Sequence, residues 1–402
     1  MKPKLKSKAS AMIFEMLSVN NPVPLDHEVD RGELMRDLIG AIKTYVVISD
    51  HAALAVALWA INTWCYEQFA RCPLLLINAP ERECGKTQLL KVVEMLVHKP
   101  IETANITLAA LFRLINNYKP TLLIDEADTF MQGKNEMAGV VNKGYERGGV
   151  VLRVESDGKE LVECAYQVHG PKAMAGIMLE RHLQDATMSR GIQIPLKRKT
   201  KDDSVKRLRS ADPMVFSNLR SRIKKLVDSE KATLVKGWSE LPESLSDRQQ
   251  DNWESLLAIA HCFGNEWYAK AHAAAVQNCI ETTPPKSSSN QLLEDIREVL
   301  SDYERQHIPS VELLDKLTGN QDMDWCSYNH GQPIKARQLA KFMSAYGIKT
   351  KTVRMRADYT PKGYEVREFE DAFARYLTER KDEPKPENKA PPLFGKPPIP
   401  NF

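Results

Sequence analysis

The chain has 402 residues, and its 56 lysines and arginines against 53 aspartates and glutamates give a formal net charge of +3. Apolar residues make up 43% and charged residues 27%, which argues against a wholly disordered chain, a fibrous protein or a disulfide scaffold. A chain of this length predicts about two to three domains.

Cysteine spacing and hydropathy indicate the cellular compartment that we expect for the protein. The seven cysteines are scattered, without a C-x-x-C pair or a zinc-finger spacing, which is typical of reduced thiols in a cytoplasmic protein. The longest apolar run, 52–61, is too short to span a bilayer, so no membrane partner is expected. The basic N-terminus carries Glu15 within a short apolar part and does not read as a signal peptide.

The first part of the chain, 1–72, is expected to be a helical segment. Leu34, Leu38, Ile42 and Tyr45 fall on one helical stripe, and the run from 51 to 69 is apolar on every side, as in a buried helix. Short apolar runs then alternate with helical stretches; they lie at 73–77, 121–124, 173–179 and 192–195. This alternation predicts an α/β domain over 73–200, with a parallel sheet covered on both faces.

One antiparallel element interrupts that pattern. The β-rich runs 150–155 and 159–164 flank Ser156-Asp157-Gly158, and Asp-Gly between two such runs predicts a hairpin.

The remainder of the chain is predicted to hold helices, a linker, a second domain and a tail. We expect a helical lid over 201–281, a linker over 282–291, a small domain over 292–381 and a proline-rich disordered tail over 382–402. Within the small domain, helices at 292–304, 310–317 and 335–346 precede a hairpin at 350–367, which is the order of a winged-helix domain.

The strongest chemical signal follows the first apolar strand. It is a candidate ATP-binding loop: Pro80, Glu81, Arg82, Glu83, Cys84, Gly85, Lys86 and Thr87, with Gln88 opening the next helix. A strand, then a loop ending in Gly-Lys-Thr, then a helix is the context of a phosphate-binding loop, whose backbone N–H groups converge on phosphate oxygens. Lys86 would bridge the β and γ phosphates, and Thr87 would bind Mg²⁺. Pro80 stands where a first glycine is usual.

A second motif lies about 40 residues downstream, where the apolar run 122–124 ends in Asp125 and Glu126. Asp125 would hold Mg²⁺ through water, and Glu126 would act as the general base toward the attacking water. The alternative is a pair of solvated carboxylates at a strand end.

With these two motifs the chain resembles a P-loop ATPase of the AAA+ type, and more narrowly domain-of-unknown-function family 3631, found in phage, plasmid and integrated-element proteins. Besides the two motifs, the resemblance, from about Ala52 to Leu377, rests on shorter stretches: Ala57-Leu58-Trp59, 170–177, Asp251-Asn252-Trp253 and Lys362-Gly363-Tyr364. It implies an AAA+-like parallel sheet with a helical lid, plus a C-terminal winged-helix-like domain.

The resemblance also implies roles for two arginines. Arg190, before the strand 192–195, would be an arginine finger reaching the γ-phosphate of a neighbouring subunit, and Arg248 would be a sensor arginine in the same chain. The polar residue expected after the strand 173–178 is not assigned among Leu179, Glu180 and His182. The alternatives are a solvated Arg190 and an Arg248 in a helix-terminal ion pair.

Candidate DNA contacts fall in three places. On the 150–164 hairpin they are Arg153 and Lys159, the alternative being an ordinary surface hairpin. In the small domain they are Lys335, Arg337, Lys341, Lys351, Arg354 and Arg356, within a stretch that lacks acidic residues. The basic run 197–209 either faces DNA or simply connects core and lid.

Together these predictions indicate an expected function. The chain would be a Mg²⁺-dependent ATPase forming a ring homo-oligomer, expected as a hexamer, that engages DNA as a helicase or translocase of a mobile element. A primase or another element-encoded protein would be a further partner. One alternative is a nucleotide-regulated scaffold in an antiviral or regulatory complex, and another is a DNA-binding initiator without unwinding activity.

Overall fold

The computed structural model describes residues 12–13, 17, 22–23, 25–103, 105–131, 133–157, 160–236, 240–282, 288–320, 323–329, 331–356 and 359–377. The expected tail, 382–402, and Lys159 lie outside these residues. The described part of the chain divides into two compact units, one ending at Thr282 and the other beginning after it.

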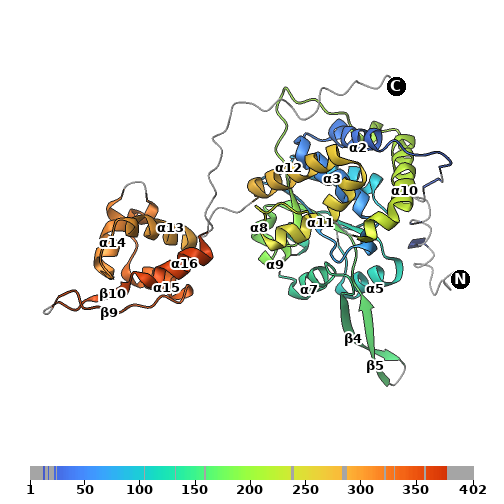
Figure 1. The fold of residues 1–402 in the computed structure, drawn as a ribbon. Coiled ribbons are helices and arrows are strands. Elements are labelled where there is room, and N and C mark those ends of the chain that lie inside the picture. Colours follow the sequence, from blue (N-terminus) through green and yellow to red (C-terminus); the bar gives the residue numbers. More distant parts are fainter. Residues whose placement is uncertain are drawn as a thin grey trace. The chain divides into compact units, whose positions relative to one another are not determined.

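The first unit holds most of the helices and the main sheet (Figure 1). Its helices are α2 (Arg31–Tyr45), α3 (Asp50–Asn62), η1 (Tyr66–Gln68), α4 (Lys86–Leu96), α5 (Leu108–Tyr118), α6 (Ala127–Phe130), α7 (Asn135–Lys143), α8 (Leu179–His182), α9 (Asp185–Met188), η2 (Leu208–Ser210), α10 (Pro213–Lys236), α11 (Asp247–Cys262) and α12 (Asn265–Thr282). Its strands are β1 (Leu74–Ala79), β2 (Pro100–Thr103), β3 (Thr121–Ile124), β4 (Val150–Asp157), β5 (Glu160–Gln167), β6 (Lys172–Ile177) and β7 (Gly191–Pro195).

The main sheet is parallel, with strand order β2-β3-β6-β1-β7, which confirms the expected sheet. The prediction from sequence did not include β2, because this edge strand has only Ile101 as a large apolar residue and is half-exposed along most of its length. Because all five strands run the same way, their carboxyl ends meet at one edge, here called the carboxyl edge; the opposite one is the amino edge.

Both faces of the sheet are covered. Along β1, Leu75 and Ile77 belong to a core shared with α2, α3, α4, α10, α11 and α12, whereas Leu74 and Leu76 belong to a second core formed with α5, α6 and α7. This alternation explains why the strands read as continuous apolar runs. Helix α3 is buried from Ala52 to Asn62, as its apolar sequence predicts, but it ends seven residues before the expected Phe69.

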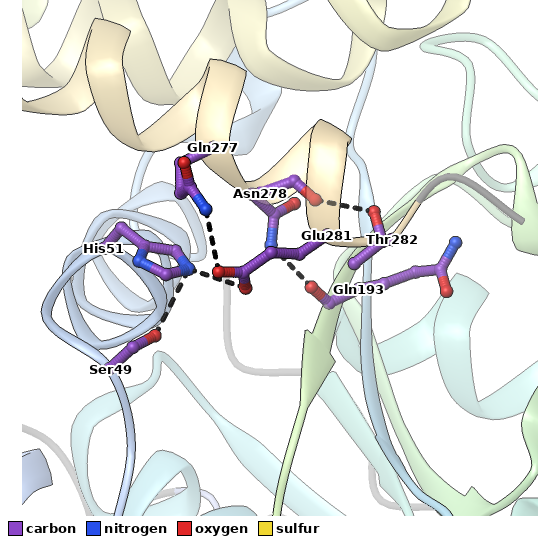
Figure 2. A network of polar contacts seen from close by, with 7 residues as sticks. All are labelled: Ser49, His51, Gln193, Gln277, Asn278, Glu281 and Thr282. Atoms are coloured by element: carbon purple, nitrogen blue, oxygen red, sulfur yellow. Dashed lines mark hydrogen bonds and ion pairs between the residues drawn. The ribbon is translucent and has the colours of Figure 1, made fainter. Parts of the chain in front are cut away.

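The helices of the expected lid belong to the core of the first unit. Helices α10, α11 and α12 pack into the same core as α2, α3 and α4, so residues up to Thr282 form one body. Figure 2 shows one link within it: His51 Nε2 lies 2.9 Å from Glu281 Oε2 and 3.2 Å from Ser49 Oγ. Both contacts use the same ring nitrogen, whereas a Ser-His-Glu relay needs both nitrogens, so this network joins α3 to α12 rather than forming a hydrolase triad.

Strands β4 and β5 form the expected hairpin, which extends from the first unit (Figure 1). Asp157 pairs with Glu160, so the strands run further than expected and the connection is residues 158–159. One face of the ribbon packs on α5, where Glu155 pairs with Arg113. The other face is apolar and open: Leu152, Val154 and Leu161 are 69%, 63% and 76% exposed.

The second unit is a small mixed domain. It comprises α13 (Ser288–Ser301), β8 (His307–Pro309), α14 (Ser310–Gly319), η3 (Asp324–Cys326), α15 (Ala336–Ala345), β9 (Lys351–Thr352), β10 (Lys362–Glu365) and α16 (Arg367–Tyr376). The strands form an antiparallel sheet of order β8-β10-β9. Helix α13 begins within the stretch expected as linker, and Leu339 and Met343 of α15 are buried.

Among the described residues, no single helix has the length and apolar character needed to cross a bilayer. Helices α2 and α3 meet that criterion only when taken together, across a bend of 116°.

Gly176 on β6 is predicted to tolerate no side chain. A Cβ there would lie 2.4 Å from Leu179 Cδ2 and 2.7 Å from Asp128 Oδ1. We expect Gly176→Ala to lower the free energy of unfolding by about 1–3 kcal/mol through overpacking, measured by urea denaturation. Gly139→Ala is the control, because nothing lies within 4 Å of a Cβ in α7 and the change there favours the helix; equal stability losses would contradict this packing.

Lys172 on β6 is buried, and its ammonium donates to Val168 O at 3.1 Å and Gly170 O at 2.8 Å. Burial lowers its pKa to about 8, below the value of an unfolded lysine. Between about pH 8 and 10.5 the unfolded chain therefore binds more protons than the native one, so this group makes stability rise with pH. Below pH 8 both states are protonated and the cost of burying the charge is constant.

We expect the free energy of unfolding of wild type to rise relative to that of Lys172→Met as the pH is raised. The relative gain should reach up to ~3 kcal/mol between pH 8 and pH 10. Titrating groups that do not interact with Lys172 cancel in this comparison of chemical denaturation curves. A difference that stays flat over that interval would mean that Lys172 keeps an ordinary pKa.

Candidate active site at the carboxyl edge of the sheet

The loop between β1 and α4 turns through two residues in the left-handed region. Gly85 has φ of +85°, a left-handed conformation that glycine adopts without strain, and α4 begins at the next residue. Glu83 also has a positive φ, +62°. The exposed part of the loop, 80–83, thus turns sharply at the carboxyl edge without a first glycine, because Pro80 occupies that position.

Lys86 folds back over this loop. Its ammonium donates a hydrogen bond of 2.9 Å to Glu81 O, across the mouth of the turn. A lysine held there places a positive charge next to the N-terminal end of α4, where free backbone N–H groups also favour an anion.

The structure brings Thr87 and Asp125 together. Thr87 Oγ1 donates to Asp125 Oδ2 at 2.8 Å, although the residues are 38 positions apart and β6 lies between their strands. The other carboxylate oxygen accepts from the Glu126 N–H at 2.9 Å. Asp125 is therefore oriented toward the loop, and its oxygens and the Thr87 hydroxyl are of the type that Mg²⁺ prefers.

Glu126 follows in a left-handed conformation, with φ of +54°, and its side chain is exposed. Backbone strain of this kind in a residue other than glycine concentrates at functional sites. The side chain is thus free to reach a water molecule at the carboxyl edge.

Sequence reasoning missed Asn78. Its amide donates to Glu180 Oε2 at 2.8 Å and its oxygen accepts from the Leu179 N–H at 3.0 Å, which fixes the chain after β6 beside the loop. Leu179 is buried, so Glu180 is the polar group that the strand end presents at this edge. An asparagine inside the otherwise apolar run 74–79 was the available signal.

Glu83 and Arg198 form an ion pair that joins the loop to the segment after β7. Both side chains are largely exposed, so the pair contributes little to stability. It does show that the basic run 197–209 begins beside the loop.

Arg190 lies at the opposite edge. The N–H of Leu74, the first residue of β1, donates to Arg190 O at 3.0 Å, whereas the loop follows Ala79, the last residue. Six strand residues span about 20 Å, so Arg190 does not reach the loop of its own chain. Its Nε is buried without a hydrogen-bond partner among the described residues.

Arg248 lies beside Arg190, which corrects its expected role as a sensor for the same chain's loop. Both guanidinium groups lie over the ring of Tyr145, at 5.6 Å for Arg248 and 5.8 Å for Arg190. Arg248 is also 3.8 Å from Asp251 within α11. The sequence placed it at a helix start but could not say at which edge of the sheet that start lies.

Two of the expected DNA contacts are already engaged within the chain. Arg153 packs over Phe112 at 5.4 Å, donates to Leu152 O and lies 4.0 Å from Glu136, so it belongs to the covered face of the hairpin. Lys351 pairs with Glu365 at 2.7 Å and Glu368 at 2.8 Å.

The remaining expected contacts in the second unit are exposed and have no acidic partner among the described residues. They are Lys335, Arg337, Lys341, Arg354 and Arg356. They lie at the start and on the outer side of α15 and in the segment after β9.

Comparison with known proteins adds a family match. The family model described as "Protein of unknown function (DUF3631)" matches residues 195–376, which is less than half of the chain. It begins after the 80–87 loop and Asp125, so it covers much less than the stretch from Ala52 to Leu377 on which the resemblance was drawn.

The chain is also similar to two known proteins. The "Uncharacterized 28.9 kDa protein in xis 5'region" of Saccharopolyspora erythraea is 31% identical over 134 residues, which are 33% of this chain and 50% of that protein. The chain thus spans half the length of that relative. A solved structure, "The A form apo structure of NrS-1 C terminal region-CTR(305-718)", is 12% identical with a TM-score of 0.38, covering 86% of this chain and 77% of that one.

Proposed function

We propose that this chain is a Mg²⁺-dependent ATPase with a P-loop of the AAA+ type. The observation that carries the proposal is the hydrogen bond between Thr87 and Asp125, which unites the phosphate-loop motif with the carboxylate of the second motif. Gly85 in the left-handed region and Lys86 over the loop complete a cradle for phosphate oxygens.

ATP would lie with its β and γ phosphates in the 80–87 loop. Mg²⁺ commonly keeps several waters and binds one or two protein oxygens together with substrate phosphates, and Thr87 and Asp125 supply such oxygens. Glu126 would orient and deprotonate the attacking water. Glu180, held by Asn78, would contact water on the γ-phosphate side.

The ATPase would work as a ring homo-oligomer, a hexamer in our proposal. Arg190 lies too far from the loop of its own chain to act there. It could therefore act only on a phosphate bound in the loop of a neighbouring copy. Repeated head-to-tail contacts between copies close into rings. Arg248 would approach the same neighbouring site from beside Arg190.

DNA would be bound by the second unit, which we propose to be a winged-helix-like module with α15 as its recognition helix. The exposed arginines and lysines of α15 and of the segment after β9 would neutralise phosphates. The protein would then act as a helicase or translocase in the maintenance of a mobile element, with a primase or another element-encoded protein as a further partner.

For DNA binding, we expect the combined change Arg337→Ala and Lys341→Ala to weaken affinity and lower the salt slope by about two, one per lost phosphate contact. Fluorescence anisotropy over a salt series measures both. The matched control is Lys351→Ala, which should leave the slope unchanged because that lysine pairs with two glutamates. If neither variant changes the salt slope, α15 does not contact DNA.

One observation favours the nucleotide-regulated scaffold as the second candidate. The open face of the β4–β5 hairpin carries Leu152, Val154 and Leu161 rather than basic residues, and exposed apolar ribbons are typical of protein contacts. The test between the two is the ATPase rate with and without DNA, on wild type and Glu126→Gln. Hydrolysis that ignores DNA, together with no DNA binding, would favour the scaffold.

A further inference from the structure

A cavity opens at the amino edge of the first unit, separate from the proposed ATP site. Its volume is about 290 Å³, near the lower limit for small-molecule pockets. Its polar lining includes Trp64, Glu67, Gln68, His98, Lys99 and Lys119.

The two lysines reach this cavity through the same local sequence. Lys99-Pro100 leads into β2 and Lys119-Pro120 leads into β3, and the two strands are neighbours, with Pro100 opposite Thr121. Both lysines have φ of +49°, and in Lys119 this left-handed conformation ends α5, where its N–H donates to Ile115 O at 2.9 Å. The neighbouring starts of β2 and β3 thus bring both lysines to the lining of one cavity.

Several polar groups in the cavity have no partner. Among the described residues, neither the Lys99 ammonium nor the His98 ring nitrogens make a hydrogen bond or an ion pair. Lys119 pairs with Glu67 at 2.7 Å, and both side chains remain half-exposed. The positive charge of two lysines is therefore only partly balanced by one carboxylate.

His98 is held in place and neutral. Its ring lies 4.8 Å from the Trp64 ring, whose indole N–H donates to Leu96 O at 3.1 Å. Burial, together with the charges of Lys99 and Lys224, lowers the pKa of His98 to about 4. At neutral pH the ring therefore offers one donor and one acceptor to a bound molecule.

We propose that this cavity binds a small oxyanion of the phosphate class, free or as the head group of a small phosphate ester, between Lys99, Lys119 and His98. Two ammonium groups and an imidazole N–H supply charged and neutral donors to such an anion. The cavity is large enough for a phosphate with a small substituent. The proposal does not depend on ATP hydrolysis at the opposite edge.

The test uses His98 as a local reporter in the full chain carrying Lys86→Ala, which removes the lysine of the carboxyl-edge loop. The ring proton resonance of His98 is followed by NMR while inorganic phosphate, glycerol phosphate or, at equal ionic strength, chloride is added. We expect a saturable shift and a rise in the His98 pKa with phosphate, because a nearby anion favours the charged ring. Chloride should give neither. If glycerol phosphate binds at least as tightly as phosphate, the ligand is an ester, and if it binds only weakly, the ligand is the free ion.

Lys99→Met and Lys119→Met, which keep the apolar stem, should each weaken binding at least tenfold, because each removes a charged donor. Lys143→Met is the matched control, since that lysine also pairs with an exposed glutamate, Glu146, at 3.6 Å. The proposal is overturned if His98 does not respond to phosphate, or if the response survives both cavity substitutions or is lost equally in the control.

Discussion

Glu126→Gln is expected to reduce the rate of ATP hydrolysis by about 10²–10⁴-fold while leaving ATP binding intact. The substitution changes only the carboxylate, and the Glu126 N–H still donates to Asp125, so the carboxylate that we propose as a Mg²⁺ ligand keeps its orientation. Steady-state hydrolysis and fluorescent-nucleotide binding measure the two effects separately.

The matched control for this change is Glu163→Gln, an exposed glutamate on β5. It should behave as wild type. Lys86→Ala, in contrast, should lose both binding and hydrolysis, because it removes the ammonium that lies over the 80–87 loop. If Glu126→Gln hydrolyses ATP at the wild-type rate, another group activates the water and the assignment of Glu126 is wrong.

Arg190→Ala is expected to lower hydrolysis by about 10³–10⁵-fold, the range of arginine fingers, and to be rescued in mixed oligomers. The structural reason is the position of Arg190 at the amino edge, a full strand length from the loop of its own chain. A site would then combine Lys86 of one copy with Arg190 of the next.

The measurement mixes Lys86→Ala chains with Arg190→Ala chains, each inactive alone. In an equimolar ring, roughly a quarter of the contacts pair an intact loop with an intact arginine, so about a quarter of the wild-type rate should return. Arg248→Ala should follow the same complementation pattern, since it lies over the same Tyr145 ring. A mixture that stays inactive would mean that the arginines do not act between copies.

One contact in the candidate site follows from the order of the strands and loops along the chain. A strand ending in the 80–87 loop and a strand ending in Asp125 predict neighbouring side chains, because parallel strands end at one edge, and Thr87 and Asp125 do meet. The hairpin was likewise predictable from Asp157-Gly158, although its strands run further than the pattern suggested.

What the sequence could not give depends on long-range packing. The partnership of Asn78 with Glu180 joins residues about a hundred positions apart, and no spacing rule predicts it. Arg248 starts a helix in either reading, but only the packing of α11 shows that it lies at the amino edge. Lys351 looked free within a run that lacks acid, yet its glutamate partners come from β10 and α16.

We propose above all that the carboxyl-edge loop hydrolyses ATP in an oligomer that responds to DNA. The most direct measurement is the Mg²⁺-dependent ATPase rate of the full chain with and without single-stranded DNA, with molar mass determined by light scattering in the same buffer. We expect hydrolysis that rises with DNA, in a species several times the mass of one chain. A monomer that hydrolyses no ATP under either condition would contradict it.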